Sequence, residues 1–154
     1  MRLLPRKHNV VAFIASWLFF AIVGAGATTQ FVLARLIDLG IDIPLIVRVS
    51  ATLDDIAGLL LTPLFAPIFG VGLLVAMLVG ALIVRFIKIW PKAVFALAGF
   101  AAIFTTFLLL RTAFDITPIA AARTTAGTLT MCVIGGLAGY IFGYVAERLK
   151  PASV

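Results

Sequence analysis

The sequence predicts an all-α integral membrane protein in which four transmembrane helices form a single membrane domain over residues 1–154. The first observation is the composition: 64% of the residues are apolar, 12% are charged, and the mean hydropathy is +1.24. Soluble domains are about half apolar and about a quarter charged, so the lipid bilayer is the expected partner of this chain. The second observation is four apolar runs of nearly membrane-spanning length, and the third is that basic residues stand at the ends of those runs.

Each apolar run approaches the length of about 20 residues that a transmembrane helix needs. The runs are Val10 to Ala27, Ile68 to Ile87, Ala93 to Leu110 and Ala126 to Ala146. The first run follows the basic segment MRLLPRKH and also has the layout of a secretory signal. Its similarity to the third run, which lies inside the chain and cannot be a signal, favours a retained helix.

The distribution of Lys and Arg predicts the orientation of these helices. One side of the membrane receives a strongly basic set with a single acid: Arg2, Arg6, Lys7, Arg85, Lys88, Lys92, Arg148 and Lys150, with Glu147. The other side receives a nearly balanced set: Arg35, Arg48, Arg111 and Arg123 with Asp38, Asp42, Asp54, Asp55 and Asp115. Lys and Arg accumulate on the cytoplasmic side, so we expect both termini in the cytoplasm of a cell with a bacterial-type inner (plasma) membrane. The net charge of +6 then reflects orientation, because no basic patch with interleaved aromatic residues indicates nucleic-acid binding.

The segment from Pro44 to Gly70 does not fit a simple connection between two spans, because it is too apolar for a solvated loop and too charged for a span. Ser50 or Thr52 can cap a helix whose first turn would contain Asp54 and Asp55. Pro63 and Pro67 would interrupt that helix before the next span. We therefore expect a short helix around residues 50–62 that is interfacial or re-entrant in the outer leaflet.

Two stretches of the chain resemble each other. ATTQFVLARLIDLGIDIPLIVRVSATL (27–53) and FTTFLLLRTAFDITPIAAARTTAGTL (104–129) share an ordered series of Thr, Phe, Leu, Arg, Asp and Pro positions after small gaps. The similarity predicts two parallel helix-elbow-helix repeats, approximately 9–88 and 93–150, related by a pseudo-twofold axis along the membrane normal. Convergence of two membrane-exit segments on similar residues is the alternative.

The charged residues of the two elbows are the candidate site. We expect Arg48, Arg123, Asp54 and Asp55 to bind a solute or ion, because two guanidinium groups at a shared cavity suit a phosphate or carboxylate. We expect Arg35, Asp42, Arg111 and Asp115 to form structural salt bridges. The alternative is that all these charges only hold the elbows together, with Arg48 paired to Asp54 or Asp55 and Arg123 paired to Asp115.

Two helices carry small residues at four-residue spacing, which is typical of close helix packing in membranes. The residues are Gly72, Ala76 and Gly80 in the second run and Gly135, Gly139 and Gly143 in the fourth. The spacing does not say whether the partner helix belongs to the same chain or to a second copy.

No motif in the sequence supports an enzyme or a cofactor. It contains no Walker loop, dinucleotide fingerprint, CxxC, HExxH or GxSxG motif, and its lone Cys132 and His8 cannot assemble a metal site or catalytic dyad. We therefore expect a small oligomeric transport or channel protein with its solute or ion site at the external elbow. A noncatalytic accessory or scaffold subunit of a larger membrane complex is the alternative, and a lipid-acting membrane enzyme is the third possibility.

Overall fold

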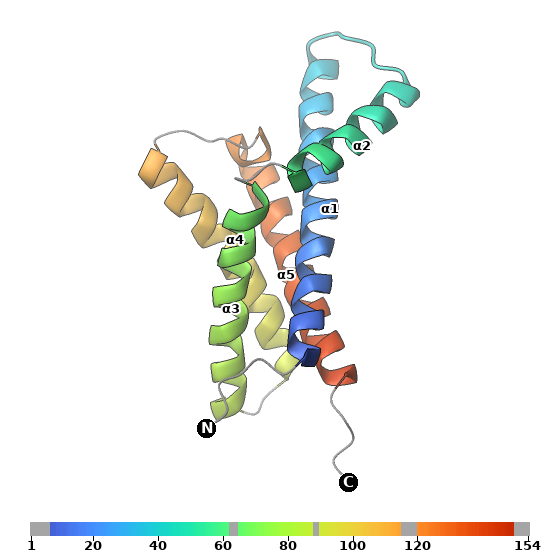
Figure 1. Cartoon of the computed structure of the whole chain (residues 1–154). Coiled ribbons are helices and arrows are strands. Elements are labelled where there is room, and N and C mark those ends of the chain that lie inside the picture. Colours follow the sequence, from blue (N-terminus) through green and yellow to red (C-terminus); the bar gives the residue numbers. More distant parts are fainter. Residues whose placement is uncertain (1–6, 62–64, 88–89, 115–119, 150–154) are drawn as a thin grey trace.

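The computed structural model describes residues 7–61, 65–87, 90–114 and 120–149 as helices and short connections (Figure 1). In chain order the elements are α1 (Lys7–Asp38), α2 (Leu45–Leu61), α3 (Phe65–Ile87), α4 (Pro91–Phe114), the 3-10 helix η1 (Ala120–Arg123) and α5 (Thr125–Arg148). Four of the helices are long and apolar enough to cross a membrane: His8–Asp38, Pro67–Phe86, Pro91–Ala113 and Thr125–Arg148. The predicted all-α class with four candidate spans is confirmed.

Helix α1 is longer than its apolar run predicted. The sequence suggested an elbow that began soon after Ala27, but α1 continues to Asp38 without a break. Thr28 and Thr29 do not interrupt it: the Thr28 hydroxyl donates back to the carbonyl of Gly24, and the Thr29 hydroxyl lies 3.1 Å from the carbonyl of Ala25. The helix ends at Asp38, and the turn that follows contains Gly40, whose φ of 84° glycine adopts readily.

Helix α2 exists where an additional short helix was predicted, but it begins earlier, at Leu45. The carbonyl of Pro44 accepts the first amide hydrogen bonds, from Val47 at 3.0 Å and Arg48 at 3.2 Å. Pro44 therefore supplies the helix start that was expected from Ser50 or Thr52. As a consequence, Asp54 and Asp55 lie in the body of α2 and not in its first turn.

Helix α5 is the centre of the bundle, with α4 on one side and α1 on the other (Figure 1). On the α1 side, the buried Ser16 hydroxyl donates a hydrogen bond of 2.7 Å to the carbonyl of Ala138. Helix α3 lies at the edge of the bundle and packs mainly on α4. The rings of Phe20, Phe69 and Phe107 connect α1, α3 and α4, with neighbouring centroids 5.4 and 5.5 Å apart.

Helices α4 and α5 approach each other closely because glycines lie on both sides of their crossing. A Cβ atom on Gly139 would collide with the carbonyl of Phe95, and one on Gly99 would collide with the carbonyl of Gly135. Gly143 lies against Phe95 in the same interface. The small residues of α5 thus contact a helix of the same chain.

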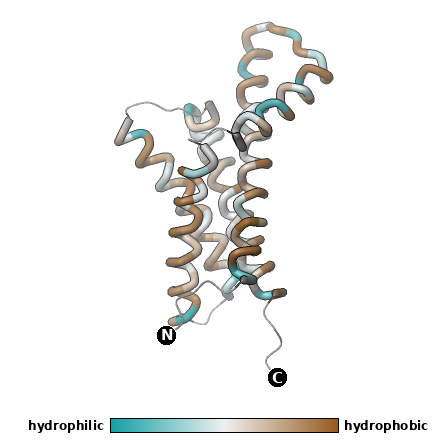
Figure 2. Tube along the Cα trace, viewed as in Figure 1, coloured by the Kyte–Doolittle hydropathy of each residue, from teal (hydrophilic) through white to brown (hydrophobic). Residues whose placement is uncertain are grey.

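Helix α3 uses its small residues in the same way. A Cβ atom on Gly72 would lie 2.7 Å from the Thr106 hydroxyl, and one on Gly80 would lie 3.1 Å from the Phe95 ring and 3.5 Å from Ala98. Figure 2 shows that apolar residues continue along the whole of α3 and along α1 into the part that extends beyond the other helices. Most of the outer surface is therefore suited to lipid.

Candidate functional site

The contacts between α1 and α5 show how far along the bundle the last residues of α1 lie. The helices run in opposite directions, with Ser16 beside Ala138 and Gly24 beside Met131. Continuing this register places Thr29 at the level where α5 begins, near Thr125. The part of α1 after Thr29 therefore lies beyond the end of the bundle, and α2 folds back along it (Figure 1).

Polar side chains connect α1 and α2 at this level. The Thr29 hydroxyl lies 2.7 Å from Oδ2 of Asp55 and 3.1 Å from the carbonyl of Ala25, and it donates to the carboxylate as the shorter, charge-assisted contact. Nε2 of Gln30 donates to Oγ1 of Thr52 at 3.1 Å, and Thr52 donates to the carbonyl of Arg48 at 2.7 Å. We call Thr29, Gln30, Arg48, Thr52 and Asp55 the outer seam.

The outer seam contains two of the predicted binding residues. Asp55 takes part through Thr29, and Arg48, which is half-buried, takes part through its backbone carbonyl, which accepts from Thr52. Asp54, the neighbouring acid, is exposed and forms no hydrogen bond within the described residues. Arg123 belongs to a different element, η1, and is exposed. The side chains of Thr29, Gln30 and Thr52 were not predicted to form the site, although the Thr-Thr-Gln sequence at the end of an apolar run is a signal that could have identified them.

The expected ion pairs of the elbows are not formed where the structure can show them. Arg48 is not within 4 Å of Asp54 or Asp55, because all three lie on one continuous helix and Asp55 is about two turns from Arg48. Arg35 and Asp42 are exposed and also form no salt bridge with another described residue. Asp115, the predicted partner of Arg123 and the counterpart of Asp42 in the second elbow, lies outside the described residues. The single salt bridge of the described part joins Lys92 to Glu147 at 3.0 Å.

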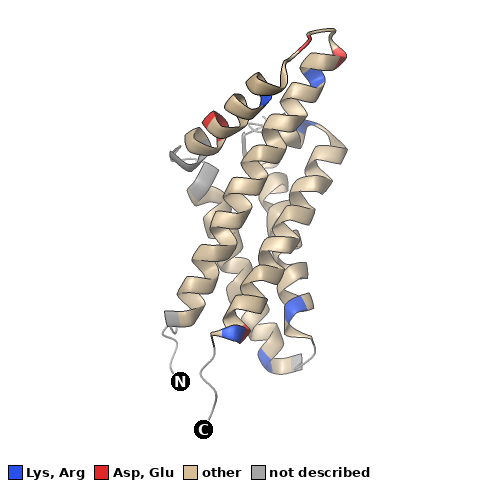
Figure 3. Cartoon of the chain, turned by 90° about the vertical axis from the view of Figure 1, so that its right-hand side faces the viewer, with Lys and Arg blue, Asp and Glu red and all other residues tan. Residues whose placement is uncertain are grey.

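The Lys92–Glu147 pair belongs to a second charged cluster at the opposite end of the bundle. Tyr144 of α5 lies near two cations, with its ring centroid 5.4 Å from Nζ of Lys92 and 5.1 Å from Cζ of Arg148. Figure 3 shows that the charged residues of the described part of the chain lie at the two ends of the bundle and on the α1–α2 hairpin. This is the distribution that a membrane imposes.

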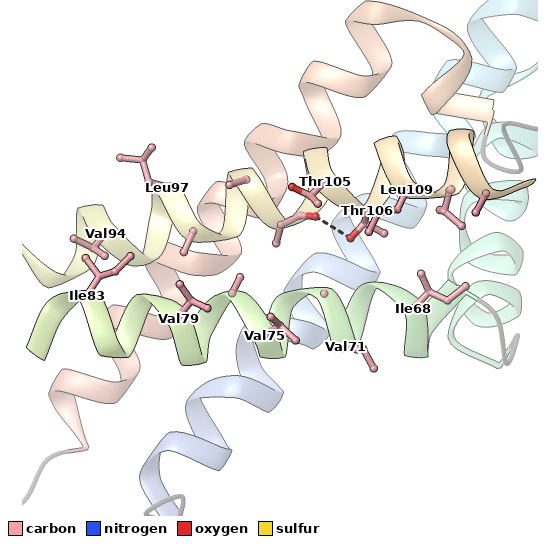
Figure 4. Close-up of a pocket in the computed structure, with 17 residues that line it drawn as sticks. Ile68, Val71, Val75, Val79, Ile83, Val94, Leu97, Thr105, Thr106 and Leu109 are labelled. Atoms are coloured by element: carbon pink, nitrogen blue, oxygen red, sulfur yellow. Dashed lines mark hydrogen bonds between the residues drawn. The ribbon is translucent and has the colours of Figure 1, made fainter. Parts of the chain in front are cut away.

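A groove of about 860 Å³ lies between α3 and α4 on the side of the bundle (Figure 4). We call it the α3–α4 groove. Its walls are apolar side chains, among them Val71, Val75 and Val79 of α3 and Leu97 of α4, and its remaining lining includes the small residues Gly72, Ala76, Ala98, Ala101 and Ala102.

Thr105 and Thr106 are the polar side chains of the α3–α4 groove. The Thr106 hydroxyl donates to the carbonyl of Ala102 at 2.8 Å, so it offers little to a ligand. The groove was not predicted, because the small residues that line α4 were not recognised as a partner of the Gly72–Ala76 face. Its chemistry suits an apolar partner and not a hydrated ion.

The described residues contain no group of three His, Cys, Asp or Glu side chains placed to hold a metal ion. The chemistry available is therefore carboxylate, guanidinium and hydroxyl groups at the outer seam, a basic and aromatic cluster at the other end, and an apolar groove between them. Comparisons with protein-family models, with curated proteins and with solved structures find no match.

Proposed function

We propose that this protein is a small noncatalytic subunit of a larger membrane complex and that it binds an apolar transmembrane helix in the α3–α4 groove. The observation that carries this proposal is the groove itself, which is apolar over the depth of α3 and α4 and is lined by small residues. Transmembrane helices associate mainly through close packing at such residues. The partner is a helix of another subunit or of a second copy of this chain.

The position of the charged residues also supports an accessory role. A transport path needs polar groups that continue across the membrane. In the described residues the charges lie at the two ends of the bundle, and the groove between α3 and α4 is lined by neither Arg48 nor Arg123. The glycine face of α5 already packs on α4 inside the chain, so the groove, which Gly72 and Ala76 help to line, is the surface best shaped for another helix.

A pair of substitutions on α4 tests the docking site. Ala101→Trp places a large ring in the groove, whereas Leu108→Trp places the same ring on an exposed α4 position that does not line it. We expect Ala101→Trp to abolish, and Leu108→Trp to retain, the partner that copurifies from native membranes and is identified by native mass spectrometry. An unchanged partner in the Ala101→Trp variant, or a wild-type protein that stays a monomer without a partner, would contradict the proposal.

The second candidate is a transport or channel protein with its solute or ion site at the outer seam, assembled as a homo-oligomer. The 2.7 Å contact between Thr29 and Asp55 favours it, because this contact holds a carboxylate at the outer end of the bundle. In this case Asp55→Asn should abolish ion flux into liposomes, and Asp54→Asn should not. Equal flux through both variants, or no flux through the wild type, would exclude Asp55 as the site.

The proposal also includes the arrangement of the helices as two repeats and their orientation in the membrane. The two helix-elbow-helix repeats would make α4 the counterpart of α1, and both termini would lie in the cytoplasm at a bacterial-type inner membrane. The excess of basic residues near Arg85, Lys92 and Arg148 supports this orientation. The similarity of the two stretches around Arg35 and Arg111 supports the duplication.

A further inference from the structure

The second charged cluster, at the end of the bundle opposite the outer seam, is not used by the proposed function. The start of α4 lies against the last turns of α5 here, because a Cβ atom on Gly143 would lie 3.2 Å from Cα of Lys92. Lys92 pairs with Glu147 at 3.0 Å, and both Lys92 and Arg148 lie over the ring of Tyr144. We call Lys92, Tyr144, Glu147 and Arg148 the basal cluster.

The basal cluster keeps one positive charge that no described carboxylate pairs with. Glu147 pairs with Lys92, whereas Arg148 forms no salt bridge with another described residue. The charged groups of Lys92 and Arg148 are at most about 10.5 Å apart, the sum of their distances to the centroid of the Tyr144 ring. A guanidinium group over an aromatic face keeps the N–H groups at its edge available for a bidentate anion such as phosphate. The basal cluster therefore attracts an anion.

The ends of two helices place the basal cluster at the depth of lipid headgroups. The candidate span Pro91–Ala113 begins here, and the candidate span Thr125–Arg148 ends here. Trp90 directly precedes the first of these spans and is 78% exposed. Trp and Tyr concentrate where the headgroups of a bilayer meet its acyl chains. The anion that a membrane offers at this depth is the phosphate group of a phospholipid.

An exposed face of α5 continues from the basal cluster into the membrane. Val133, Leu137, Tyr140 and Tyr144 follow one another at spacings of four, three and four residues, so they lie on one side of the helix. Their side chains are between 40% and 53% exposed, so no described part of the chain covers them. Leu137 lies about 16 Å from Arg148 along the helix axis, at the depth of acyl chains. The α3–α4 groove contains no residue of α5, so this face is a separate surface.

We infer that the basal cluster binds an anionic phospholipid. The guanidinium group of Arg148 binds the phosphate beside the ammonium group of Lys92, and an acyl chain lies along Leu137 and Val133. A phospholipid joins an anion to an acyl chain, whereas a free anion would leave the face of α5 uncovered. The positive charge favours an anionic lipid over phosphatidylcholine, whose choline group brings a cation of its own. Under the proposed orientation the lipid belongs to the cytoplasmic leaflet, whose surface is negatively charged.

Native mass spectrometry of the full chain, released from nanodiscs of phosphatidylglycerol and phosphatidylcholine, tests this site. The wild type should retain phosphatidylglycerol in preference to phosphatidylcholine. Arg148→Gln should lower the affinity for phosphatidylglycerol about tenfold, which corresponds to about 1.4 kcal/mol. Arg148 is exposed at the end of α5, so the variant should fold, and its melting temperature in detergent checks this.

Arg85→Gln is the matched control for Arg148→Gln. Arg85 is also exposed and lies in the last turn of α3, at the same end of the bundle, so its replacement makes the same change of net charge. It is not part of the basal cluster, and Arg85→Gln should keep the wild-type affinity. Ala101→Trp should keep it as well, which separates this result from failure of the proposed groove.

Two soluble probes separate a lipid site from a site for a free anion. Inorganic phosphate carries the anion without an acyl chain and should not displace phosphatidylglycerol. Short-chain phosphatidylglycerol should bind more weakly than the long-chain lipid, because it covers less of the apolar face of α5.

Three results would overturn the inference. An unchanged affinity for phosphatidylglycerol in Arg148→Gln would remove the arginine from the site. An equal loss in Arg85→Gln would assign the binding to the general positive charge of this end. Displacement of the lipid by inorganic phosphate would assign the basal cluster to a free anion.

Discussion

Gly139 shows how strictly the α4–α5 contact depends on single atoms. A methyl group at Gly139 would collide with the carbonyl of Phe95, which belongs to helical backbone and cannot rotate away. We expect Gly139→Ala to lower the free energy of unfolding by about 1–3 kcal/mol, the usual cost of overpacking. Thermal denaturation in detergent, followed by size-exclusion chromatography, measures the effect.

Gly136 is the matched control for this substitution. A Cβ atom there would lie 3.4 Å from the carbonyl of Ala96 and 3.6 Å from Cβ of Phe100, which are ordinary contacts. Gly136→Ala should therefore leave the melting temperature unchanged or slightly raised. If both variants had the same melting temperature, below that of the wild type, close packing of α4 and α5 would not be the reason for glycine at position 139.

Thr28 and Thr29 offer a second comparison between neighbours. Both hydroxyls lie within hydrogen-bond distance of a carbonyl of α1, but only the Thr29 hydroxyl also contacts Asp55, to which it donates. Thr29→Val removes the hydroxyl that donates to the Asp55 carboxylate. It should lower the free energy of local opening of α2 by about 1 kcal/mol, which raises the amide exchange rate by a factor of about five. Hydrogen exchange of peptides from residues 45–61 measures this change, and Thr28→Val should not produce it. Similar exchange in both variants would mean that the Thr29–Asp55 contact does not hold the hairpin.

At the scale of the helix, replacing Gly40 or Gly58 by alanine should change the free energy of unfolding in opposite directions. A methyl group added to Gly40 or Gly58 would have no neighbouring atom within 4 Å, so collisions with other residues do not decide the outcome. Gly40 lies in the turn after α1 with a φ of 84°, and alanine there should cost about 1–2 kcal/mol. Gly58 lies inside α2, where alanine is the better helix former by about 1 kcal/mol.

The unfolding free energies of Gly40→Ala and Gly58→Ala, compared with the wild type, test this difference. Exchange protection of α2 should fall in the first variant and rise in the second. Two changes of the same sign would show that the helix ends are not set by local backbone preference.

The same local preferences explain which elements could be predicted. The apolar runs predicted the four spans, and the segment after Pro44 predicted an additional helix. The start of α2 was placed too late, because Pro44 was not recognised as its first acceptor and the capping residues Ser50 and Thr52 appeared better suited. The length of α1 was missed because its apolar run ends at Ala27, although a threonine such as Thr28 can donate its hydroxyl to a backbone carbonyl and so continue a helix.

The candidate site was less predictable than the helices. Asp55 and Arg48 were expected in it, but their partners depend on how α2 folds back on α1. The apolar pattern of the sequence does not predict how these two helices pack. The salt bridges expected for Arg48 do not form, because α2 begins at Leu45 and not at Ser50 or Thr52, so that Arg48 lies on the same helix as Asp54 and Asp55. The α3–α4 groove is created by two helices that pack at an angle, so its lining residues are separate in sequence and become a surface only in the fold.

The whole molecule has one basic end and one end of mixed charge, which predicts its orientation. We expect a cysteine at Asp42, in the exposed connection between α1 and α2, to react with a membrane-impermeant maleimide added to intact cells. A cysteine at Arg148 should react only after the membrane is opened. The native Cys132 is buried and should stay unlabelled in both cases. Labelling of Arg148→Cys but not of Asp42→Cys in intact cells would reverse the assigned orientation.

The central place of α5 has a consequence for how the protein is made. A ribosome completes α1, α2 and α3 before α5, yet α1 packs chiefly on α5 and α3 packs chiefly on α4. The early helices therefore wait in the membrane as separate segments, and the bundle closes only when the last one is inserted. A chain that stops before Thr125 would leave α1 and the polar Ser16 without their main partner and would be open to membrane quality-control proteases.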